Sequence, residues 1–260
     1  MTQLYIIPDF RCLNDSATYA TEQDLRFEYN DFIFPSVLDD EKLVEERIAD
    51  YKKLNRDCSE DTMHGAFFDV TVFSFDAKIR ETSMLRMRQS MEIAGKMGLR
   101  GVVFHGNHFP FLHGEIYDTN WLNRTEEAMR LLAKDYPEIE LFMENMFDDT
   151  PEMLGKLAER LTDVKNFGIC LDYAHALLTS KNGTLWFERL GKFVRHIHVN
   201  DHCFSGDAHM APGDGMTDWE EFFRLKEQYA PEATVLCEVS GLDKTKQGID
   251  FLKKRMTKKM

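Results

Sequence analysis

The sequence predicts an α/β fold: a closed (β/α)8 barrel, in which eight parallel strands alternate with helices. Three observations predict it. The chain has 260 residues, and a barrel of this kind typically needs about 250. Short apolar runs alternate along the chain with longer segments of helical periodicity. No low-complexity linker or change of composition divides the sequence, so we expect a single domain over residues 1–260.

Each element of the barrel is assigned from its local pattern. The expected strands cover residues 4–7, 26–30, 62–67, 101–105, 140–144, 168–172, 195–199 and 234–238. Helical patterns lie between them, at residues 41–54, 77–98, 121–135, 151–161, 185–194, 219–230 and 244–256. The first crossover, at residues 15–25, is poorly defined. Thr150 precedes Pro151 at the expected start of one helix, and Thr217 with Glu220 predicts a capping box before another.

Composition and charge narrow the classes of protein that fit. The chain carries 32 Lys and Arg against 45 Asp and Glu, a net charge of −13, which argues against a general nucleic-acid-binding surface. The five cysteines form no Cys-x-x-Cys pair and no signal peptide is recognisable, so we expect reduced thiols in a cytoplasmic protein. No apolar run approaches the ~18 residues that a membrane span requires, so no membrane partner is expected.

Four of the expected strands end in side chains that can bind a metal ion. In chain order these are Glu144, Asp172, His198 and Glu238. Side chains alternate between the two faces of a strand, and a single inward assignment serves all four residues. The C-terminal ends of barrel strands surround the mouth where barrel enzymes keep their active sites. Carboxylates combined with imidazole favour Zn, Mn or Fe over Ca. The sequence therefore predicts a divalent metal site at this mouth.

Further residues of the same chemical types accompany these four. His64 and His105 end the third and fourth strands, and His175 lies just past the tip of the sixth. Asp207 and His209 lie in the long loop after the seventh strand. We interpret all five as substrate-binding groups or additional metal ligands. The remaining histidines are interpreted as structural or solvent-exposed: His108, His113, His196 and His202.

These segments, in this order, resemble the xylose isomerase-like TIM barrel superfamily, which includes sugar isomerases, sugar epimerases and the endonuclease IV type of apurinic-site nuclease. The resemblance runs from about His64 to Glu238. The matching segments are HGAFFD (64–69), VVFH (102–105), MEN (143–145), LDYAH (171–175), HIHVND (196–201), DAHMAPGDG (207–215) and CE (237–238). The resemblance implies a metal-binding barrel enzyme.

The resemblance also implies a role for each potential ligand. Four residues match the single-metal quartet of the keto-sugar epimerases and related isomerases, whose two glutamates both touch the metal and move the proton: Glu144, Asp172, His198 and Glu238. Five match the further ligands with which the nuclease branch builds a three-zinc cluster: His64, His105, His175, Asp207 and His209. The implied cofactor is a divalent ion (Mn, Zn, Co or Fe), with one ion expected and up to three allowed.

Two classes of enzyme fit this set of residues. We expect a metal-dependent sugar or sugar-phosphate isomerase or epimerase of carbohydrate metabolism. It would move a proton next to a carbonyl through an enediolate, with Glu144 and Glu238 as the acid–base pair. The alternative is an endonuclease IV-like multinuclear zinc phosphodiesterase acting on abasic DNA, which needs Lys and Arg on the strand-end loops. Those loops contain very little of either. A third class, a non-catalytic barrel that binds metal and sugar, is disfavoured by the intact glutamate pair.

The sequence leaves several properties open. They are the identity of the sugar substrate and its phosphorylation, isomerase against epimerase activity, the metal and its number, and homo-oligomerisation. No Gly-rich phosphate loop is present, and no Arg follows Asn200 and Asp201, where many sugar epimerases of this superfamily carry one. The aromatic loop at 106–117 is interpreted either as a lid over a sugar ring or as a cover for the barrel rim.

Overall fold

The computed structural model confirms the closed barrel and describes residues 2–67, 69–112 and 114–257. Within those residues, eight parallel strands pair in chain order, and β8 pairs back with β1 to close the sheet. The strands are β1 (Leu4–Ile6), β2 (Arg26–Tyr29), β3 (Thr62–His64), β4 (Gly101–His105), β5 (Glu140–Glu144), β6 (Phe167–Asp172), β7 (Val194–Val199) and β8 (Thr234–Cys237). Most bounds agree with the expected ones to within a residue or two, whereas β3 ends early, at His64.

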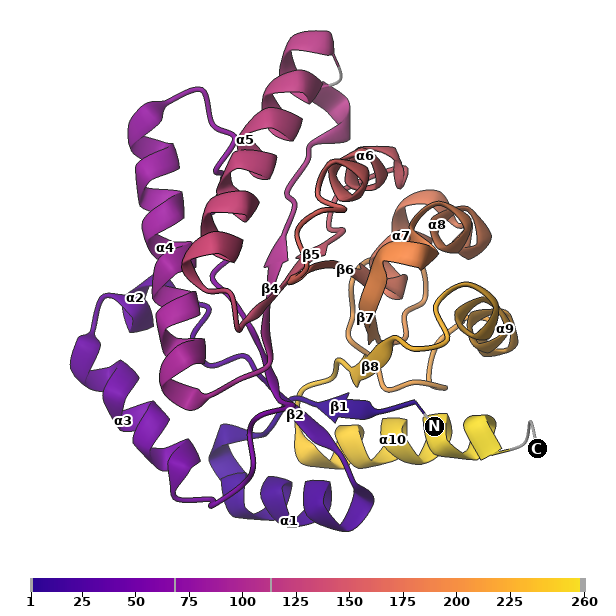
Figure 1. Cartoon of the computed structure of the whole chain (residues 1–260). Helices are drawn as coiled ribbons and strands as arrows, with labels where there is room; N and C mark the ends of the chain where they lie inside the picture. The colour runs from indigo at the N-terminus through magenta and orange to yellow at the C-terminus, as the bar shows by residue number, and fades with distance from the viewer. Residues whose placement is uncertain (1, 68, 113, 258–260) are drawn as a thin grey trace.

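Helices surround the strands as an outer ring (Figure 1). They are α1 (Leu13–Gln23), α2 (Pro35–Leu38), α3 (Glu41–Lys52), α4 (Ala77–Met97), α5 (Glu115–Asp135), α6 (Glu152–Arg160), α7 (Tyr173–Ser180), α8 (Gly183–Leu190), α9 (Trp219–Tyr229) and α10 (Leu242–Thr257). Short 3-10 turns occur at η1 (Phe10–Cys12), η2 (Pro110–Leu112) and η3 (Gly191–Phe193). Within the described residues, none of these helices combines the length and the apolar character that crossing a bilayer would require.

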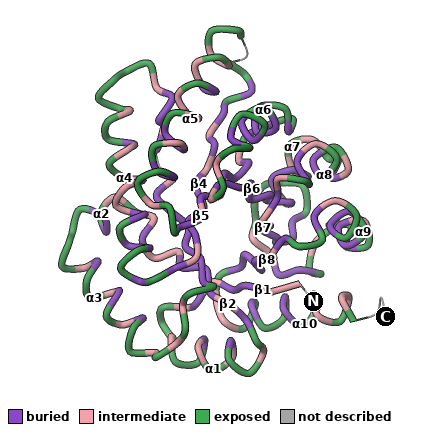
Figure 2. The backbone as a smooth tube through the Cα atoms, in the orientation of Figure 1, coloured by how far each residue is buried: buried purple, intermediate pink, exposed green. Residues whose placement is uncertain are grey.

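The strands separate two apolar layers. Val103, Phe142 and Cys170 form a small buried cluster of their own, whereas Leu141 and Met143 belong to the large cluster shared with the helices. Because successive side chains of a strand point to opposite faces, this division confirms the inward parity expected for β5 and β6. Figure 2 shows buried residues concentrated in the central strands and exposed residues on the outer helices. The inward face therefore carries the strand-end carboxylates into the barrel mouth.

Three of the described helices were poorly defined in or absent from the sequence pattern: α1, the four-residue α2 and α7. The first crossover forms α1, which ends at Asp24, a residue in the left-handed conformation with φ of 52°. Helix α7 follows β6 without a loop. Asp172 starts it, because its side chain accepts a hydrogen bond of 2.6 Å from the His175 backbone N–H. The last strand residue is thus also a helix cap, and this fixes one of its two carboxylate oxygens.

Both expected helix caps are wrong. Helix α9 is capped by Asp218, whose carboxylate accepts hydrogen bonds of 3.0 Å from the backbone N–H groups of Glu220 and Glu221. Thr217 instead donates its backbone N–H to Asp201. At α6, Pro151 itself occupies the cap position and no side chain makes a capping bond. The carboxylate at 218 is a stronger acceptor than the neighbouring hydroxyl, and the backbone contact of Thr217 favours this choice.

Candidate metal centre

The four strand-end residues come together at the C-terminal mouth of the barrel. Glu144 and Asp172 end β5 and β6. His198 is the penultimate residue of β7, and Glu238 follows the last residue of β8. Their exposed fractions are 0% for Glu144, Asp172 and His198 and 7% for Glu238. Parallel pairing of neighbouring strands aligns their C-terminal ends, which is why residues far apart in the chain share one small volume.

One nitrogen lies at the centre of this group. His198 Nδ1 is 3.4 Å from Glu144 Oε1 and 3.5 Å from Glu238 Oε2. Asp172 joins the group, since it, His198 and Glu238 offer ligand atoms within 4.8 Å of one another. Three carboxylates and an imidazole at these spacings form a donor set suited to a divalent transition ion.

The hydrogen bonding of these atoms supports the fit. Within the described residues, several buried atoms of the group make no hydrogen bond: both carboxylate oxygens of Glu144, Asp172 Oδ2, Glu238 Oε2 and His198 Nδ1. Buried carboxylate oxygens without partners are unfavourable, and neighbouring negative charges add repulsion. A bound dication would relieve both penalties, so the residues present fit a metal ion.

A second group adjoins the first through Glu144. His64 and His105, which end β3 and β4, face each other with their Nε2 atoms 3.1 Å apart. Glu144 Oε2 lies 3.4 Å from the first of these nitrogens and 3.3 Å from the second. All three residues offer ligand atoms within 4.8 Å of one another. The two oxygens of Glu144 thus belong to two different clusters of ligand-type atoms.

A third group is formed by His175, Asp207 and His209. Asp207 Oδ2 is 3.3 Å from His175 Nε2 and 2.8 Å from His209 Nε2. His175 also adjoins the first group, with Nδ1 3.7 Å from both Glu144 and Asp172. All nine residues singled out in the sequence therefore lie in three contiguous groups.

Backbone carbonyls orient three of the imidazoles. The Nδ1 atoms of His64, His175 and His209 lie 2.9–3.0 Å from the carbonyl oxygens of Gly65, Asn145 and Glu238. This contact favours a proton on Nδ1 and directs Nε2 toward the other ligand-type groups. His198 differs, because it presents Nδ1 to the carboxylates.

The two glutamates have different electrostatic environments. Burial works to raise the pKa of Glu144, but the nearby imidazoles of His198 and His105 hold it well below its usual range. Burial dominates at Glu238: despite His198, and with the negative charge of Asp172 adding to it, the pKa of Glu238 rises to about 8. Two carboxylates with divergent proton affinities at one site are the arrangement that acid–base catalysis uses.

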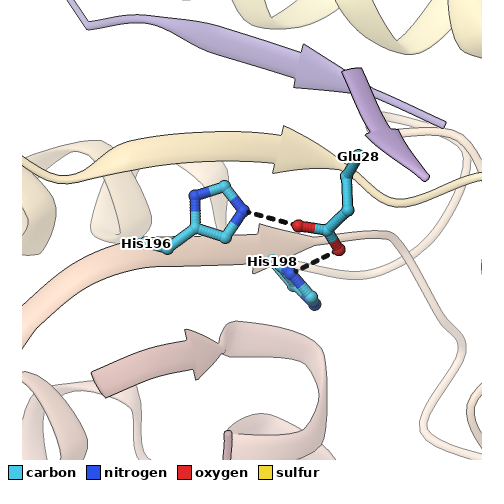
Figure 3. Close-up of side chains that lie close together, drawn as sticks. All are labelled: Glu28, His196 and His198. Atoms are coloured by element: carbon cyan, nitrogen blue, oxygen red, sulfur yellow. Dashed lines mark ion pairs between the residues drawn. The ribbon is translucent and has the colours of Figure 1, made fainter. Parts of the chain in front are cut away.

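Sequence reasoning missed Glu28. This residue of β2 is fully buried, and its carboxylate oxygens lie 3.2 Å from His196 Nε2 and 3.1 Å from His198 Nε2 (Figure 3). Burial opposes ionisation, but the two imidazoles hold the pKa of Glu28 well below its usual range. An inward-pointing Glu in a short strand was the available signal, because a buried carboxylate requires a partner.

The other histidines occupy varied positions. His196 is buried, with Nε2 3.2 Å from Glu28, and its structural role stays a prediction. His202 is buried, and His108 is buried 3.0 Å from Asp118. His113 lies outside the described residues.

Asp201 organises the loop that carries Asp207 and His209. Its carboxylate accepts four hydrogen bonds of 2.9–3.0 Å from loop groups: the backbone N–H of His202, Gly213 and Thr217, and the indole N–H of Trp219. A Cβ at Gly215 would collide with the same carboxylate. These donors overcome the effect of burial and lower the pKa of Asp201. The long loop is therefore built around one ionised side chain.

Asp201→Asn is expected to lower the free energy of unfolding by about 2–4 kcal/mol, because an amide NH2 would face N–H donors and leave them unpaired. Urea denaturation measures this. Asp214→Asn, in the same loop but exposed, is the matched control and should change stability by less than about 0.5 kcal/mol. Since the pKa of Asp201 is lowered, its contribution is present at neutral pH and disappears as the pH falls through that pKa. Equal stability of the two variants would contradict this role.

The loops around the mouth are acidic. We call the described residues of 7–12, 30–34, 65–76, 106–114, 145–151, 200–218 and 238–241 the rim loops. Among them Arg11 is the only Lys or Arg, and it is paired with Asp9 at 2.8 Å. Acidic residues recur in most of these loops, including Asp148 and Asp149 after β5. The rim therefore disfavours polyanionic ligands.

The aromatic loop after β4 contributes exposed rings to this rim. Phe109 and Phe147 contact each other with ring centroids 5.2 Å apart, and both remain nearly half exposed. Phe111 is almost fully exposed. Movement of this loop as a lid stays a prediction.

Comparison with known proteins identifies the family. The profile described as xylose isomerase-like TIM barrel matches residues 24–255. The uncharacterized protein MJ1311 of Methanocaldococcus jannaschii is 30% identical over 182 residues, which cover 65% of this chain and 60% of that protein. A second uncharacterized protein of that organism, MJ1614, is 25% identical over 171 residues, covering 62% and 63%. The chain thus spans less than two thirds of the length of either curated relative.

Solved structures share the fold. The TTHB071 protein from Thermus thermophilus, from a crystal soaked with ZnCl2, superposes with a TM-score of 0.75 at 20% identity and covers 96% of each chain. A D-tagatose 3-epimerase-like protein gives a TM-score of 0.75 at 20% identity, covering 99% of this chain and 97% of that one. The 3-keto-D-glucoside 4-epimerase YcjR from E. coli gives 0.68 at 16% identity, covering 99% and 100%. Because the family profile matches most of its length, the chain belongs to the xylose isomerase-like TIM barrel family.

Proposed function

We propose that this protein is a metal-dependent sugar isomerase or epimerase. One observation carries the proposal: two buried glutamates from different strands, Glu144 and Glu238, reach the same nitrogen, His198 Nδ1, at 3.4 and 3.5 Å. Structural similarity to a D-tagatose 3-epimerase-like protein and to a 3-keto-D-glucoside 4-epimerase supports the same class.

The proposed chemistry assigns work to each residue. Glu144, Asp172, His198 and Glu238 would hold a divalent ion, which when bound would polarise the carbonyl of a sugar. Glu144 and Glu238 would remove and return the proton on the carbon next to that carbonyl. Their different proton affinities fit a pair in which one group accepts while the other donates. His175 and His209 would contact sugar hydroxyls.

The acidic rim loops narrow the range of sugars that we propose as substrates. A neutral sugar can enter a mouth lined by carboxylates, and hydroxyl groups can donate hydrogen bonds to them. A phosphorylated sugar or a sugar acid would be disfavoured, because the described rim loops are rich in carboxylates and contain Arg11 as their only Lys or Arg, which already pairs with Asp9. We therefore propose an unphosphorylated keto- or aldo-sugar.

Proton exchange with solvent tests this function. The metal-loaded protein is incubated in heavy water with a panel of neutral ketoses and aldoses, and deuterium next to the carbonyl is read by NMR. We expect incorporation into at least one sugar and none in the Glu238→Gln variant. Incorporation that is equal in wild type and variant would contradict the proposal, and so would its absence from every sugar tested.

A multinuclear phosphodiesterase is the second candidate. The group of His64, His105 and Glu144 favours it, because it offers ligand atoms for an ion beyond the quartet. The described rim loops contain almost no Lys or Arg, and this argues against the nuclease, because binding a DNA phosphate backbone requires basic side chains. Elemental analysis and a nicking assay on abasic DNA separate the two: three ions together with Glu144-dependent nicking would establish the nuclease.

A further inference from the structure

We infer that Glu28 is a positioning residue for the metal centre: it holds the imidazole of His198 with Nδ1 directed at the carboxylates. The inference rests on the proposed metal dependence and assigns a new residue to that site. Glu28 lies on β2, far in sequence from the strands that carry the ligands. Its carboxylate faces Nε2 of His198, whereas Glu144 and Glu238 face the other ring nitrogen, Nδ1.

The two nitrogens of His198 face two different groups. Nδ1 faces Glu144 and Glu238, whereas Nε2 faces Glu28 Oε1 at 3.1 Å. Carboxylates on both sides accept but do not donate, and the shorter contact, at Nε2, favours the proton of a neutral imidazole on the side of Glu28. The lone pair is then at Nδ1, where the ligand-type oxygens converge. Carboxylate–histidine–metal arrangements work in this way.

Other buried groups hold Glu28 in place. Its second oxygen, Oε2, accepts a hydrogen bond of 2.8 Å from the Thr62 hydroxyl and lies 3.2 Å from His196 Nε2. The other nitrogen of His196 is 2.6 Å from the Thr234 hydroxyl. Figure 3 shows the carboxylate between the two imidazoles, with one oxygen toward each. Oε2 accepts a hydrogen bond, Oε1 lies 3.1 Å from His198 Nε2, and the side chain has no exposed surface, so the carboxylate has little freedom to rotate.

Glu28, His196 and His198 also lie close enough together to hold an ion themselves, with ligand atoms within 4.8 Å. Two features favour the positioning role. Each imidazole nitrogen already faces its own carboxylate oxygen at ion-pair distance, and Thr62 donates to one of those oxygens. On the Nδ1 side, within the described residues, three oxygens of Glu144 and Glu238 make no hydrogen bond, whereas Glu28 has one such oxygen, Oε1.

The test is the Zn²⁺ affinity of Glu28→Gln, measured by competition with a chromophoric chelator. Loss of a partner behind a metal-binding histidine typically weakens affinity by about 10–100-fold, and we expect a loss in that range with the number of ions unchanged. Glu140→Gln is the matched control. Glu140 is also a strand glutamate paired with two basic side chains, Arg100 and Arg195, but at the start of β5. It should bind Zn²⁺ as the wild type does.

Two further measurements guard against a folding artefact. Thr62→Val leaves the charge of Glu28 intact and removes one hydrogen bond, so it should weaken Zn²⁺ binding in the same direction but less. In the Zn²⁺-loaded wild type, ¹⁵N NMR should show His198 protonated at Nε2, and this signal should shift in Glu28→Gln. If Glu28→Gln does not fold, an unchanged affinity in Thr62→Val overturns the inference.

The outcomes separate this inference from the proposed function. Wild type that binds no divalent ion would overturn both. Wild type that binds Zn²⁺, with equal affinity in Glu28→Gln, would overturn the role of Glu28 and leave the metal centre standing. Loss of one ion per chain in Glu28→Gln, with the remaining sites unaffected, would make Glu28 a ligand and overturn its positioning role.

Discussion

Replacing Glu144 by Gln is expected to slow proton exchange next to the substrate carbonyl by at least about 10²–10⁴-fold, the range that general acid–base groups contribute. The loss should exceed the acid–base contribution alone, because Glu144, like Glu238, has two proposed duties. An amide cannot accept the proton, and it is a poorer ligand than a carboxylate for a dication. Both oxygens of Glu144 are involved, since each faces a different group of imidazoles.

The folded structure allows this effect to be separated from misfolding. The side-chain oxygens of Glu144 make no hydrogen bond to described residues, but they lie at ion-pair distance from the imidazoles of His105 and His198. The metal-free variant should therefore be less stable in urea than metal-free wild type, and exchange rates are compared without urea after circular dichroism shows that both are folded. Exchange is measured by NMR in heavy water, with Glu140→Gln as the control that keeps wild-type rates. Retention of exchange in Glu144→Gln would remove this residue from the catalytic pair.

Asp172→Asn is expected to weaken divalent-metal binding by more than about 100-fold, beyond the loss typical for a residue behind a ligand. The reason is local. Asp172 Oδ1 caps helix α7 through the His175 N–H, and Oδ2 is the oxygen without a hydrogen bond. Asn is as good a helix cap as Asp. The substitution therefore keeps the cap and removes the negative charge that lies close to His198 and Glu238.

A matched cap provides the control for this prediction. Asp218 caps α9 by accepting hydrogen bonds from the backbone N–H groups of Glu220 and Glu221. It belongs to none of the residue groups described above that could hold a metal ion. Asp218→Asn should leave metal content and affinity at wild-type values. Metal content by elemental analysis and affinity by chelator competition are the measurements. Identical binding by both variants would exclude Asp172 from the metal site.

Much of the barrel follows from local pattern. Apolar runs of strand length, separated by helical periodicity, are properties of neighbouring residues, and they predicted the β-strands to within a few positions. The period of two along a strand then placed Glu144 on the same face as Phe142 and away from Met143. The separation of the inner cluster from the outer one confirms this. Metal-ligand chemistry is also local, since carboxylate and imidazole keep their character in any fold.

The contacts between side chains that lie far apart in the chain could not be predicted from local pattern. Glu28 is one inward glutamate among 45 acidic residues, and its importance depends on β2 facing β7 across the barrel interior. The helix cap at Asp218 and the four donors around Asp201 depend equally on how a loop returns to the strand ends. These contacts are set by three-dimensional closure.

The sequence by itself determined the strand order, the inward face and the chemical types available at the mouth, because each of these depends on residues near one another in the chain. The tertiary structure alone decided which atoms meet: that the two oxygens of Glu144 serve different groups, and that His198 has a carboxylate on each side. The physical reason is that closure of the barrel brings side chains of β2 and β7 within 3.1 Å of each other, although Glu28 and His198 are 170 positions apart in the chain (198 minus 28). A local sequence pattern cannot predict a contact between residues that far apart in the chain.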